Sequence, residues 1–196
     1  WGILFSHPRD FTPVCTTELG RAAKLAAEFS KRNVKMIALS IDSVQDHLSW
    51  SKVQGMGRRK RGSQGSGPSC GELSVRLQEM VVWKCQLSTC QKGNHESPPE
   101  QKIQLVFVFG PDKKLKLSIL YPATTGRNFD EILRVVDSLQ LTAYKKVATP
   151  VDWKPGDSVM VVPTLPDDEA KKLFPKGIFT KDLPSGKKYL RYTPQP

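Results

Sequence analysis

Residues 3–19 read ILFSHPRDFTPVCTTEL and pass from a short apolar run into an amphipathic segment. The apolar run at 3–5 predicts a buried strand, and His7-Pro8 closes it. A helix is expected to begin at about Pro13, because proline suits the first helical turn, where its missing N–H has no partner to lose. Cys15 is therefore expected in the first turn of a helix that directly follows a strand.

This position suggests that Cys15 is a reactive thiol. A helix N-terminus lowers a thiol pKa, and a nearby guanidinium lowers it further. Thr12, three residues earlier, can offer a hydroxyl to a substrate oxygen. The Cys-x-x-Cys spacing is absent, because positions 12 and 18 are Thr and Glu, so a two-thiol mechanism is excluded. Cys15 would attack alone and become oxidised itself; the alternative is a buried, inert cysteine.

The helix that carries Cys15 is expected to continue to Arg32. Its apolar residues recur at three- and four-residue spacing, and Asn33 ends it. Residues 36–41, MIALSI, then predict a second buried strand.

Another helix is expected over residues 46–52. Ser43 precedes it as a plausible cap, since serine side chains accept hydrogen bonds from the first free N–H groups of a helix. Leu48 and Trp50 are its expected apolar anchors.

The C-terminal half of the core begins with residues 105–109, LVFVF, a continuous apolar run typical of a buried strand. Residues 110–113 predict a turn, and residues 115–119 alternate apolar with polar side chains, so the pair forms a hairpin. A helix with an apolar stripe follows over 129–139, and Asn128 is its expected N-cap.

The resulting order of elements is β-α-β-(α)-β-β-α. Two parallel strands joined by a right-handed crossover, followed by an antiparallel hairpin, make a mixed four-stranded sheet. The sequence therefore predicts an α/β protein with a thioredoxin-like fold. We place this domain at residues 1–143.

Residues 144–196 form the second predicted domain. The chain is rich in proline and lysine here and reads as an extended, arm-like unit. Residues 167–174 predict a short helix, with acidic residues first and lysines later, as the helix dipole favours.

Residues 53–104 differ in composition from both neighbours and are expected to be mostly loop or disordered. Only residues 73–87 are weakly typical of a helix. By number alone, zinc could be bound by four residues of this segment: Cys70, Cys85, Cys90 and His95. We disfavour a zinc site, because the ligands of true zinc sites come in more closely spaced pairs. The run Arg58-Arg59-Lys60-Arg61 is interpreted as a solvated charge run rather than a nucleic-acid patch. Translated non-coding sequence is a further interpretation of this segment.

Composition limits the class of protein. The chain has 196 residues and a formal net charge of +11, but its basic residues are scattered, often beside acids, which favours a lysine-coated enzyme over a nucleic-acid binder. No stretch approaches the roughly 20 apolar residues of a membrane span. Four cysteines are too few for a disulfide scaffold, so a reducing, cytoplasmic setting is expected.

The stretch Phe5 to Leu19 resembles the peroxidatic motif of the peroxiredoxins, whose Pro-x-x-x-Thr-x-x-Cys core corresponds to Pro8, Thr12 and Cys15. Four further stretches are similar to the 1-Cys subgroup, of the peroxiredoxin 6 type: IALSIDS at 37–43, FVFGPDKK at 107–114, YPATTGRN at 121–128 and TPVDW at 149–153. The resemblance covers residues 1–52 and 105–196.

The resemblance implies a thiol peroxidase that reduces hydrogen peroxide and organic or phospholipid hydroperoxides. Cys15 would be the peroxidatic thiolate, which becomes a sulfenic acid. Thr12 would hydrogen-bond the peroxide and the thiolate, and Pro8 would shield the pocket from water. His7 would contact the region of the sulfur, and Arg127 would be one of two arginines that line the pocket.

The resemblance also implies partners. Glutathione would be the reducing co-substrate, delivered by a glutathione transferase, and no cofactor or metal would be bound. The family forms homodimers in the cytoplasm, and some members reach lysosomes. Contact with a membrane would be peripheral at most, and residues 144–196 would be the family's C-terminal 1-Cys peroxiredoxin domain.

Two departures from the family pattern affect the expected activity. Gln104 stands where the family has its other pocket arginine, and losing a guanidinium removes a peroxide donor and a charge that lowers the thiol pKa. The family's calcium-independent phospholipase A2 activity uses a serine, a histidine and an aspartate, of which only the aspartate matches, as Asp112. We therefore do not expect the phospholipase activity. The alternative to the peroxidase is a catalytically impaired relative with a thioredoxin fold, or a splice or gene-model variant that does not fold stably.

Overall fold

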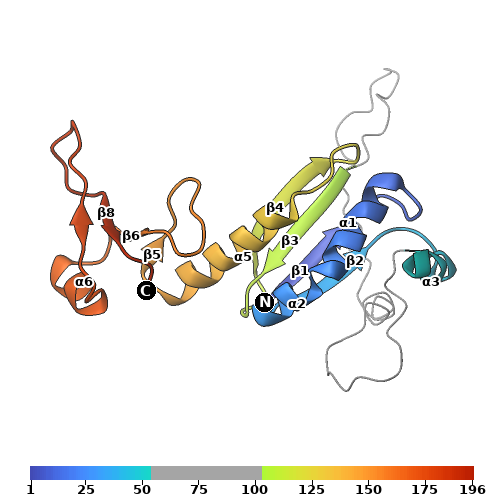
Figure 1. Ribbon diagram of the computed structural model, residues 1–196, viewed down its shortest axis with the longest axis horizontal. Coiled ribbons are helices and arrows are strands. Elements are labelled where there is room, and N and C mark those ends of the chain that lie inside the picture. The colour runs from blue at the N-terminus through green and yellow to red at the C-terminus, as the bar shows by residue number, and fades with distance from the viewer. Residues whose placement is uncertain (54–102) are drawn as a thin grey trace, which may run out of the picture. The chain divides into compact units, whose positions relative to one another are not determined.

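The computed structural model describes residues 1–53 and 103–196 (Figure 1). Contacts within the chain divide it into unit 1, Trp1–Arg127, and unit 2, Asn128–Pro196. This division falls before the long helix α5, whereas the boundary drawn from the sequence falls after it, at 143/144. The helix expected over residues 73–87, the basic run at 58–61 and the zinc reading all lie outside the described residues.

Unit 1 is built on a mixed four-stranded sheet in the order β2-β1-β3-β4. Its strands are β1 (Gly2–Ser6), β2 (Lys35–Leu39), β3 (Ile103–Phe109) and β4 (Leu115–Pro122). β1 pairs in parallel with β2 and antiparallel with β3, and β3 pairs antiparallel with β4. This is the sheet that the sequence predicts, although β3 begins two residues before the expected start at 105.

Side chains on one face of β1 and β3 form a buried apolar row. Phe5 lies opposite Val106 and Ile3 opposite Val108, and all four side chains are buried. Because side chains alternate along a strand, continuing this register by one residue pair places His7 opposite Gln104 on the same face. The apolar row thus ends in two buried polar residues at the carboxyl end of β1.

The crossover from β1 to β2 consists of two helices, α1 (Pro13–Lys24) and α2 (Ala26–Lys31), where the sequence predicted one (Figure 1). The break is at Leu25, whose N–H is shared between the carbonyls of Arg21 and Ala22, so the turn tightens locally. No Gly or Pro marks this break, which explains why the sequence did not show it. The expected end of the crossover is confirmed: Asn33 has a positive φ of 52° and closes the helix.

Helix α3 (Val44–Val53) follows β2 and is two residues longer at its start than expected. The Ser43 side chain accepts a hydrogen bond from the Asp46 N–H at 3.2 Å, so its role as cap is confirmed. Trp50 is buried, as expected of an anchor. Leu48 is exposed, so its expected anchoring role is wrong; it lies on a different side of the helix from Trp50.

Unit 2 begins with α5 (Phe129–Tyr144), and Asn128 caps it by accepting hydrogen bonds from the N–H groups of Asp130 and Glu131. The rest is more ordered than the arm that the sequence predicts. It contains a second sheet, in the order β5-β6-β8-β7, and the expected short helix, α6 (Asp167–Leu173). The strands have two or three residues each: β5 (Val147–Ala148), β6 (Val159–Val161), β7 (Phe179–Thr180) and β8 (Arg191–Thr193).

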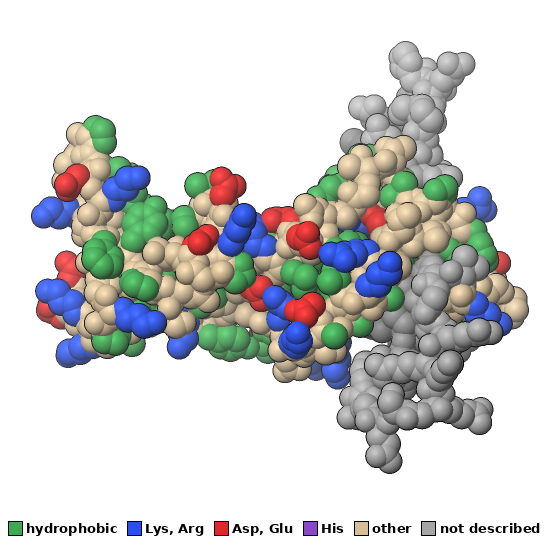
Figure 2. All heavy atoms as spheres, in the orientation of Figure 1, with side chains coloured by type: hydrophobic (Ala, Val, Ile, Leu, Met, Phe, Trp, Pro, Cys, Tyr) green, Lys and Arg blue, Asp and Glu red, His purple; other side chains and the backbone are tan. Residues whose placement is uncertain are grey.

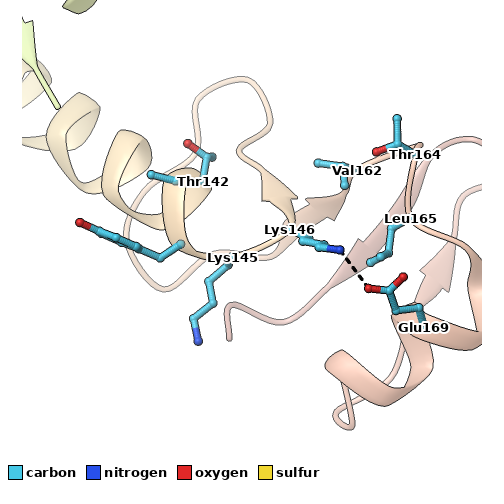
Figure 3. A pocket seen from close by; sticks show the side chains of 9 residues that line it. Thr142, Lys145, Lys146, Val162, Thr164, Leu165 and Glu169 are labelled. Atoms are coloured by element: carbon cyan, nitrogen blue, oxygen red, sulfur yellow. Dashed lines mark hydrogen bonds and ion pairs between the residues drawn. The ribbon is translucent and has the colours of Figure 1, made fainter. Parts of the chain in front are cut away.

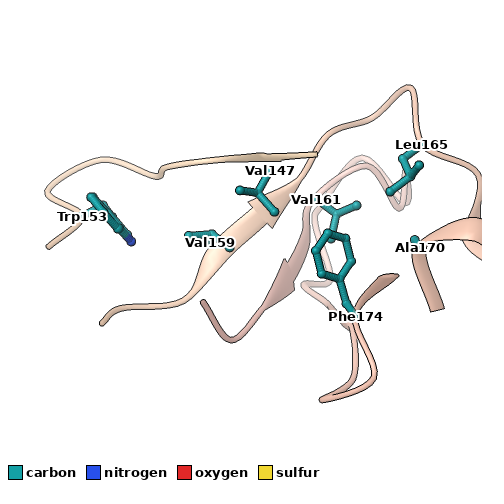
Figure 4. Close-up of a cluster of buried hydrophobic side chains, with 7 residues drawn as sticks. All are labelled: Val147, Trp153, Val159, Val161, Leu165, Ala170 and Phe174. Carbon is teal, nitrogen blue, oxygen red and sulfur yellow. The ribbon is translucent and has the colours of Figure 1, made fainter. Parts of the chain in front are cut away.

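A separate apolar cluster stabilises unit 2, with Trp153 at one end and Ala170 at the other (Figure 4). The cluster brings together buried side chains from β5, β6 and α6, from the loops between them and from Phe174, which follows α6. The Trp153 indole N–H donates to the carbonyl of Asp157 at 3.2 Å, so the buried ring keeps a partner for its polar atom.

Charged side chains of both signs are interspersed on the face of the molecule drawn in Figure 2. This distribution agrees with the scattered charge of the sequence. Within residues 1–53 and 103–196, the structure has no helix that is both long and apolar enough to cross a bilayer.

Candidate active site

Cys15 is the third residue of α1 and is almost fully buried, with 1% of its surface exposed. Thr12 occupies the N-cap position, with an extended backbone at φ −100° and ψ 143°, and Pro13 follows as the first helical residue. The Thr16 N–H donates to the Thr12 carbonyl at 3.0 Å, which closes the first turn around Cys15. The strand, loop and helix therefore place the thiol where the sequence predicts it.

The sequence predicts a lowered pKa for the Cys15 thiol, and this direction is wrong. Burial raises the pKa of Cys15 above its usual value, because the thiolate is poorly solvated there. A hydrogen bond with Thr12 lowers the pKa, but the Glu18 carboxylate raises it again and offsets the Arg127 guanidinium. The Glu18 carboxylate, in the next turn of the helix, opposes the effects of the helix N-terminus and the guanidinium on which the prediction was based.

Arg127 is held by a buried ion pair with Glu18. Its Nη2 donates to Glu18 Oε2 at 2.7 Å, and its Nε and backbone N–H both donate to Oε1, at 3.1 and 2.7 Å. Its Nη1 donates to the carbonyls of Ser6 and Leu105, at 3.2 and 3.0 Å. The guanidinium also lies over the Phe5 ring, 5.4 Å from the centroid. Arg127 thus joins β1, β3 and α1, and its charge acts on both Cys15 and His7.

His7 follows β1 and is 4% exposed. Its Nε2 lies 2.7 Å from Asp10 Oδ1, while Nδ1 is buried without a partner among the described residues. Burial lowers the pKa of His7, and the hydrogen bond to Asp10 counteracts part of that effect.

Trp50 connects His7 to the first turn of α1. Its ring lies 5.2 Å from the His7 ring, centroid to centroid, and its indole N–H donates to the Thr16 hydroxyl at 3.1 Å. His7 is thereby placed beside the helical turn that holds Cys15.

Pro8 is half-buried between His7 and the exposed Arg9. The Thr12 hydroxyl lies 3.0 Å from the Arg9 carbonyl and donates to it. Phe11, between them, has a positive φ of 54°, an unfavourable conformation for an aromatic residue that turns the loop sharply into α1. The loop from Pro8 to Thr12 therefore approaches the thiol as a tight turn.

Gln104 is fully buried on β3. Its Nε2 donates to the Ala123 carbonyl at 3.1 Å, and its Oε1 has no partner among the described residues. Position 104 precedes Leu105, whose carbonyl Arg127 binds, so it lies at the edge of the cluster formed by His7 and Arg127. A neutral amide occupies this place, as expected from the sequence.

Sequence reasoning gave no role to Asp10, Glu18 or His47. Asp10 and Glu18 lie within the motif itself, and two acids flanking a candidate thiol were the signal that could have found them. His47 lies 37 positions from its partner Asp10, on another helix, so only the fold reveals it.

Asp112, the residue that matches the phospholipase aspartate, lies apart from Cys15. Asp112 lies in the turn between β3 and β4, at the end of the sheet opposite Gln104, where it pairs with Lys116 at 2.8 Å. Cys70, Cys85, Cys90 and His95 lie outside the described residues. Among the residues that are described, no cluster of three or more acidic, histidine or cysteine side chains could hold a metal ion.

A pocket of about 500 Å³ lies within unit 2, between the end of α5, the residues that follow β6, and α6 (Figure 3). Lys146 reaches Glu169 across it, with Nζ and Oε1 2.9 Å apart, while Lys145 points away. None of the predicted site residues lines this pocket.

Two family models match the chain. Residues 1–59 match the AhpC/TSA family, and residues 138–177 match the C-terminal domain of 1-Cys peroxiredoxin. The first match contains the whole motif around Cys15, and the second lies in unit 2.

Curated relatives match over the full length of this chain. Peroxiredoxin-6 of Gallus gallus is 72% identical over 197 residues, and peroxiredoxin-6 of Homo sapiens is 68% identical over 205 residues. Each match covers 100% of this chain and 86% of the relative.

Solved structures agree with these matches. A cysteine-to-serine mutant of the peroxiredoxin 6 of Arenicola marina superposes with a TM-score of 0.74 at 55% identity, covering 100% of this chain and 86% of that one. A yeast mitochondrial 1-Cys peroxiredoxin, studied for thiol resolution via glutathione/thioredoxin systems, superposes with a TM-score of 0.68 at 37% identity, covering 99% and 86%.

Proposed function

Because the chain belongs to the 1-Cys peroxiredoxins of the peroxiredoxin 6 type and is a thiol peroxidase, we propose that Cys15 carries its reaction with hydroperoxides. The observation that carries this proposal is the place of Cys15: a buried thiol in the first turn of α1, beside Thr12, Arg127 and Glu18. The alternative of a catalytically impaired relative is not favoured, given relatives at 72% and 68% identity.

The reaction requires no group beyond the thiol and the peroxide. The Cys15 thiolate attacks one peroxide oxygen, an S–O bond forms, and the O–O bond breaks. The leaving oxygen takes up a proton, so the products are a sulfenic acid and water or an alcohol. We assign the Thr12 hydroxyl to turn its one proton from the Arg9 carbonyl toward the sulfur or the attacked oxygen, which the lowering of the Cys15 pKa by Thr12 supports.

We assign supporting roles to the residues that surround Cys15. Arg127 is assigned to hold the thiol turn against the sheet, since its donors reach the carbonyls of Ser6 and Leu105 and the Glu18 carboxylate. His7 provides a buried ring nitrogen, Nδ1, that has no hydrogen-bond partner among the described residues. Pro8 keeps water from the thiol, which its half-buried position in the tight loop supports.

We assign glutathione as the reductant of the sulfenic acid, delivered by a glutathione transferase. The yeast mitochondrial 1-Cys peroxiredoxin, linked in its structural study to glutathione/thioredoxin systems, supports this class of reductant. Cys15 is buried, so a carrier protein that opens access to the thiol fits the structure better than free glutathione alone.

The experiment follows catalytic turnover with hydrogen peroxide under three reductants: glutathione, glutathione with glutathione transferase, and thioredoxin with its reductase. We expect sustained turnover with glutathione and the transferase, and a mixed disulfide between Cys15 and glutathione in the mass spectrum. Turnover with thioredoxin alone, and none with glutathione, would contradict the assignment.

We further propose that the protein acts as a homodimer. β4 is an edge strand, and it exposes Leu115 and Leu120, which are 51% and 63% exposed. A second copy of the chain could cover these side chains. Sedimentation equilibrium tests this, with a single monomeric species as the contradicting result.

The setting that we propose is the cytoplasm, which the small number of cysteines and the need for a reduced Cys15 support. Phospholipid hydroperoxides are proposed as substrates at a membrane surface, by peripheral contact only. The net charge of +11 supports attraction to an anionic surface.

A further inference from the structure

Two histidines of unit 1 share the two oxygens of one buried carboxylate, that of Asp10. His7 Nε2 lies 2.7 Å from Asp10 Oδ1, and His47 Nδ1 is hydrogen-bonded to Asp10 Oδ2. The Asp10 side chain is fully buried, and the side chains of His7 and His47 are 3% and 15% exposed. The three side chains come from the loop after β1 and from α3, so the fold, not the local sequence, joins them.

Hydrogen bonds also fix the backbone of Asp10. The Asp10 N–H donates to Asp42 Oδ2 at 2.7 Å. The Ser40 hydroxyl lies 2.8 Å from Asp42 Oδ2 and 3.2 Å from Asp10 Oδ1. Arg9 forms only a long, largely exposed ion pair with Asp42, with Nε and Oδ1 3.9 Å apart. These contacts leave Asp10 little freedom to turn away from either histidine.

This arrangement fixes which nitrogen of His7 carries the proton. An ionised carboxylate accepts hydrogen bonds and donates none, so the ring nitrogen facing it must carry the N–H. Nε2 of His7 is therefore the donor, and in the neutral ring Nδ1 is a bare acceptor. Burial lowers the pKa of His7, which keeps the ring neutral near pH 7. Nδ1 is buried and has no partner among the described residues.

Trp50 connects the His7 ring to the helical turn that holds Cys15. The His7 ring packs on Trp50, whose N–H binds the hydroxyl of Thr16, the residue after Cys15. Arg127 influences the pKa of both His7 and Cys15. A hydroperoxide bound at Cys15 brings an O–H group, and a buried acceptor without a partner is the group that such a donor requires.

We propose that His47 is a positioning residue for peroxide reduction, which acts through Asp10 to hold His7 with Nε2 protonated and Nδ1 free to accept a hydrogen bond from the hydroperoxide. This inference rests on the proposed role of Cys15. It assigns His47 no contact with substrate. The function of His47 is to occupy Asp10 Oδ2, so that the carboxylate stays oriented toward His7 with its other oxygen.

The chain allows a matched pair of variants for the test. In His47→Asn the amide Nδ2 takes the place of the ring Nδ1 and keeps the donor to Asp10. His47→Leu has nearly the same shape as the asparagine and no donor. Leu48→Ala, at the exposed neighbouring position of α3, serves as the control for nonspecific effects on the helix.

Two readouts are measured on each reduced protein: the second-order rate constant with hydrogen peroxide, and the ¹⁵N chemical shifts of the histidine rings. The chain has three histidines, so a His95→Gln background leaves only His7 and His47 to assign. We expect His47→Leu to lower the rate about tenfold, as the loss of one hydrogen bond to a charged group would. Its His7 ring should show a mixture of the two neutral tautomers. His47→Asn and Leu48→Ala should keep the wild-type rate and the single tautomer.

The proposal is overturned if His47→Leu keeps both the rate and the tautomer. It is also overturned if the Asn and Leu variants lose the rate equally, because packing of the ring would then matter instead of its N–H. Should His47→Leu fail to fold, His47→Gln replaces it. The glutamine amide lies one methylene beyond the position of Nδ1, so we expect His47→Gln to react more slowly with peroxide than His47→Asn. Failure of the wild-type protein to oxidise at Cys15 would instead refute the proposed function.

Discussion

At the residue scale, Cys15 has surroundings that act on its thiolate in opposite directions. Burial and the Glu18 carboxylate raise its pKa, while Thr12 and Arg127 lower it, and the net direction is upward. We therefore expect the free protein to hold less Cys15 thiolate near neutral pH than an exposed cysteine would.

We expect the rate of peroxide reduction to rise with pH through the usual thiol pKa of about 8.5 and beyond it, because only the thiolate attacks. Stopped-flow kinetics across a pH series, with thiolate absorbance in the ultraviolet, measures both quantities. A rate that is already independent of pH below neutrality would contradict the raised pKa.

The same shift links stability to pH. Since the folded pKa of Cys15 lies above the unfolded value, the stabilisation is present below the unfolded pKa and is lost as pH rises through the folded one. The free energy of unfolding of Cys15→Ser should lack this alkaline decrease, which makes that variant the control.

Gln104→Arg is expected to lower the pKa of Cys15 and to raise the rate with peroxide. The substitution adds a cation at the edge of the cluster of His7 and Arg127, where a neutral amide now leaves Oε1 unpaired. Thiolate absorbance and peroxide kinetics test both effects. Gln104→Leu is the control, since it removes the amide without adding charge; equal effects of the two variants would show that charge at position 104 is irrelevant.

Arg127→Leu is expected to destabilise the protein by about 3–5 kcal/mol, because it leaves the buried Glu18 carboxylate without its cation. Urea unfolding measures the change. Lys31→Leu breaks the exposed pair of Lys31 with Glu28 and should have a much smaller effect. Similar losses from the two variants would mean that the buried pair has no special weight.

The sequence predicts the residues of the site better than their partners. The motif placed Cys15, Thr12, Pro8 and His7 in one loop and turn, because neighbours in sequence stay neighbours in space. The pairing of Glu18 with Arg127 spans 109 positions, and that of Asp10 with His47 spans 37. Such pairs depend on how β1 and β3 pair and on where α3 packs, and local periodicity specifies neither.

At the scale of elements, long apolar patterns were reliable and short ones were not. The four strands of the first sheet and the helices α3 and α5 follow from apolar runs, periodicity and caps. The break between α1 and α2 has no sequence marker, since hydrogen bonding changes there without Gly or Pro. The strands of unit 2 are too short for alternation to show, so that part was interpreted as an extended arm.

Asn128 tests how much a cap contributes to its helix. Its side-chain oxygen accepts from the N–H groups of Asp130 and Glu131, at 3.0 and 3.2 Å. We expect Asn128→Ala to lower the free energy of unfolding by about 1 kcal/mol, and Asn128→Asp to lower it much less, since aspartate also caps helices. Urea unfolding of both variants is the measurement, and equal losses would argue against capping as the cause.

At the scale of the whole molecule, two units with separate cores divide the work. Unit 1 contains every described residue to which we assign a role in peroxide chemistry. Unit 2 has its own sheet, apolar cluster and pocket, and it contains the match to the C-terminal domain of 1-Cys peroxiredoxin. We propose that the chemistry takes place in unit 1, where one buried thiol at the start of α1 reduces the peroxide and is itself oxidised.

Single-turnover oxidation of the full chain tests this claim most directly. The reduced protein is mixed with one equivalent of hydrogen peroxide, the sulfenic acid is trapped chemically, and the modified peptide is identified by mass spectrometry, in parallel with Cys15→Ser. The account predicts rapid loss of peroxide, with the trapped oxygen on Cys15, and no such reaction in the serine variant, because a hydroxyl has no accessible anion near neutral pH. Peroxide consumption that persists in Cys15→Ser, or a sulfenic acid found on Cys70, Cys85 or Cys90 instead, would contradict it.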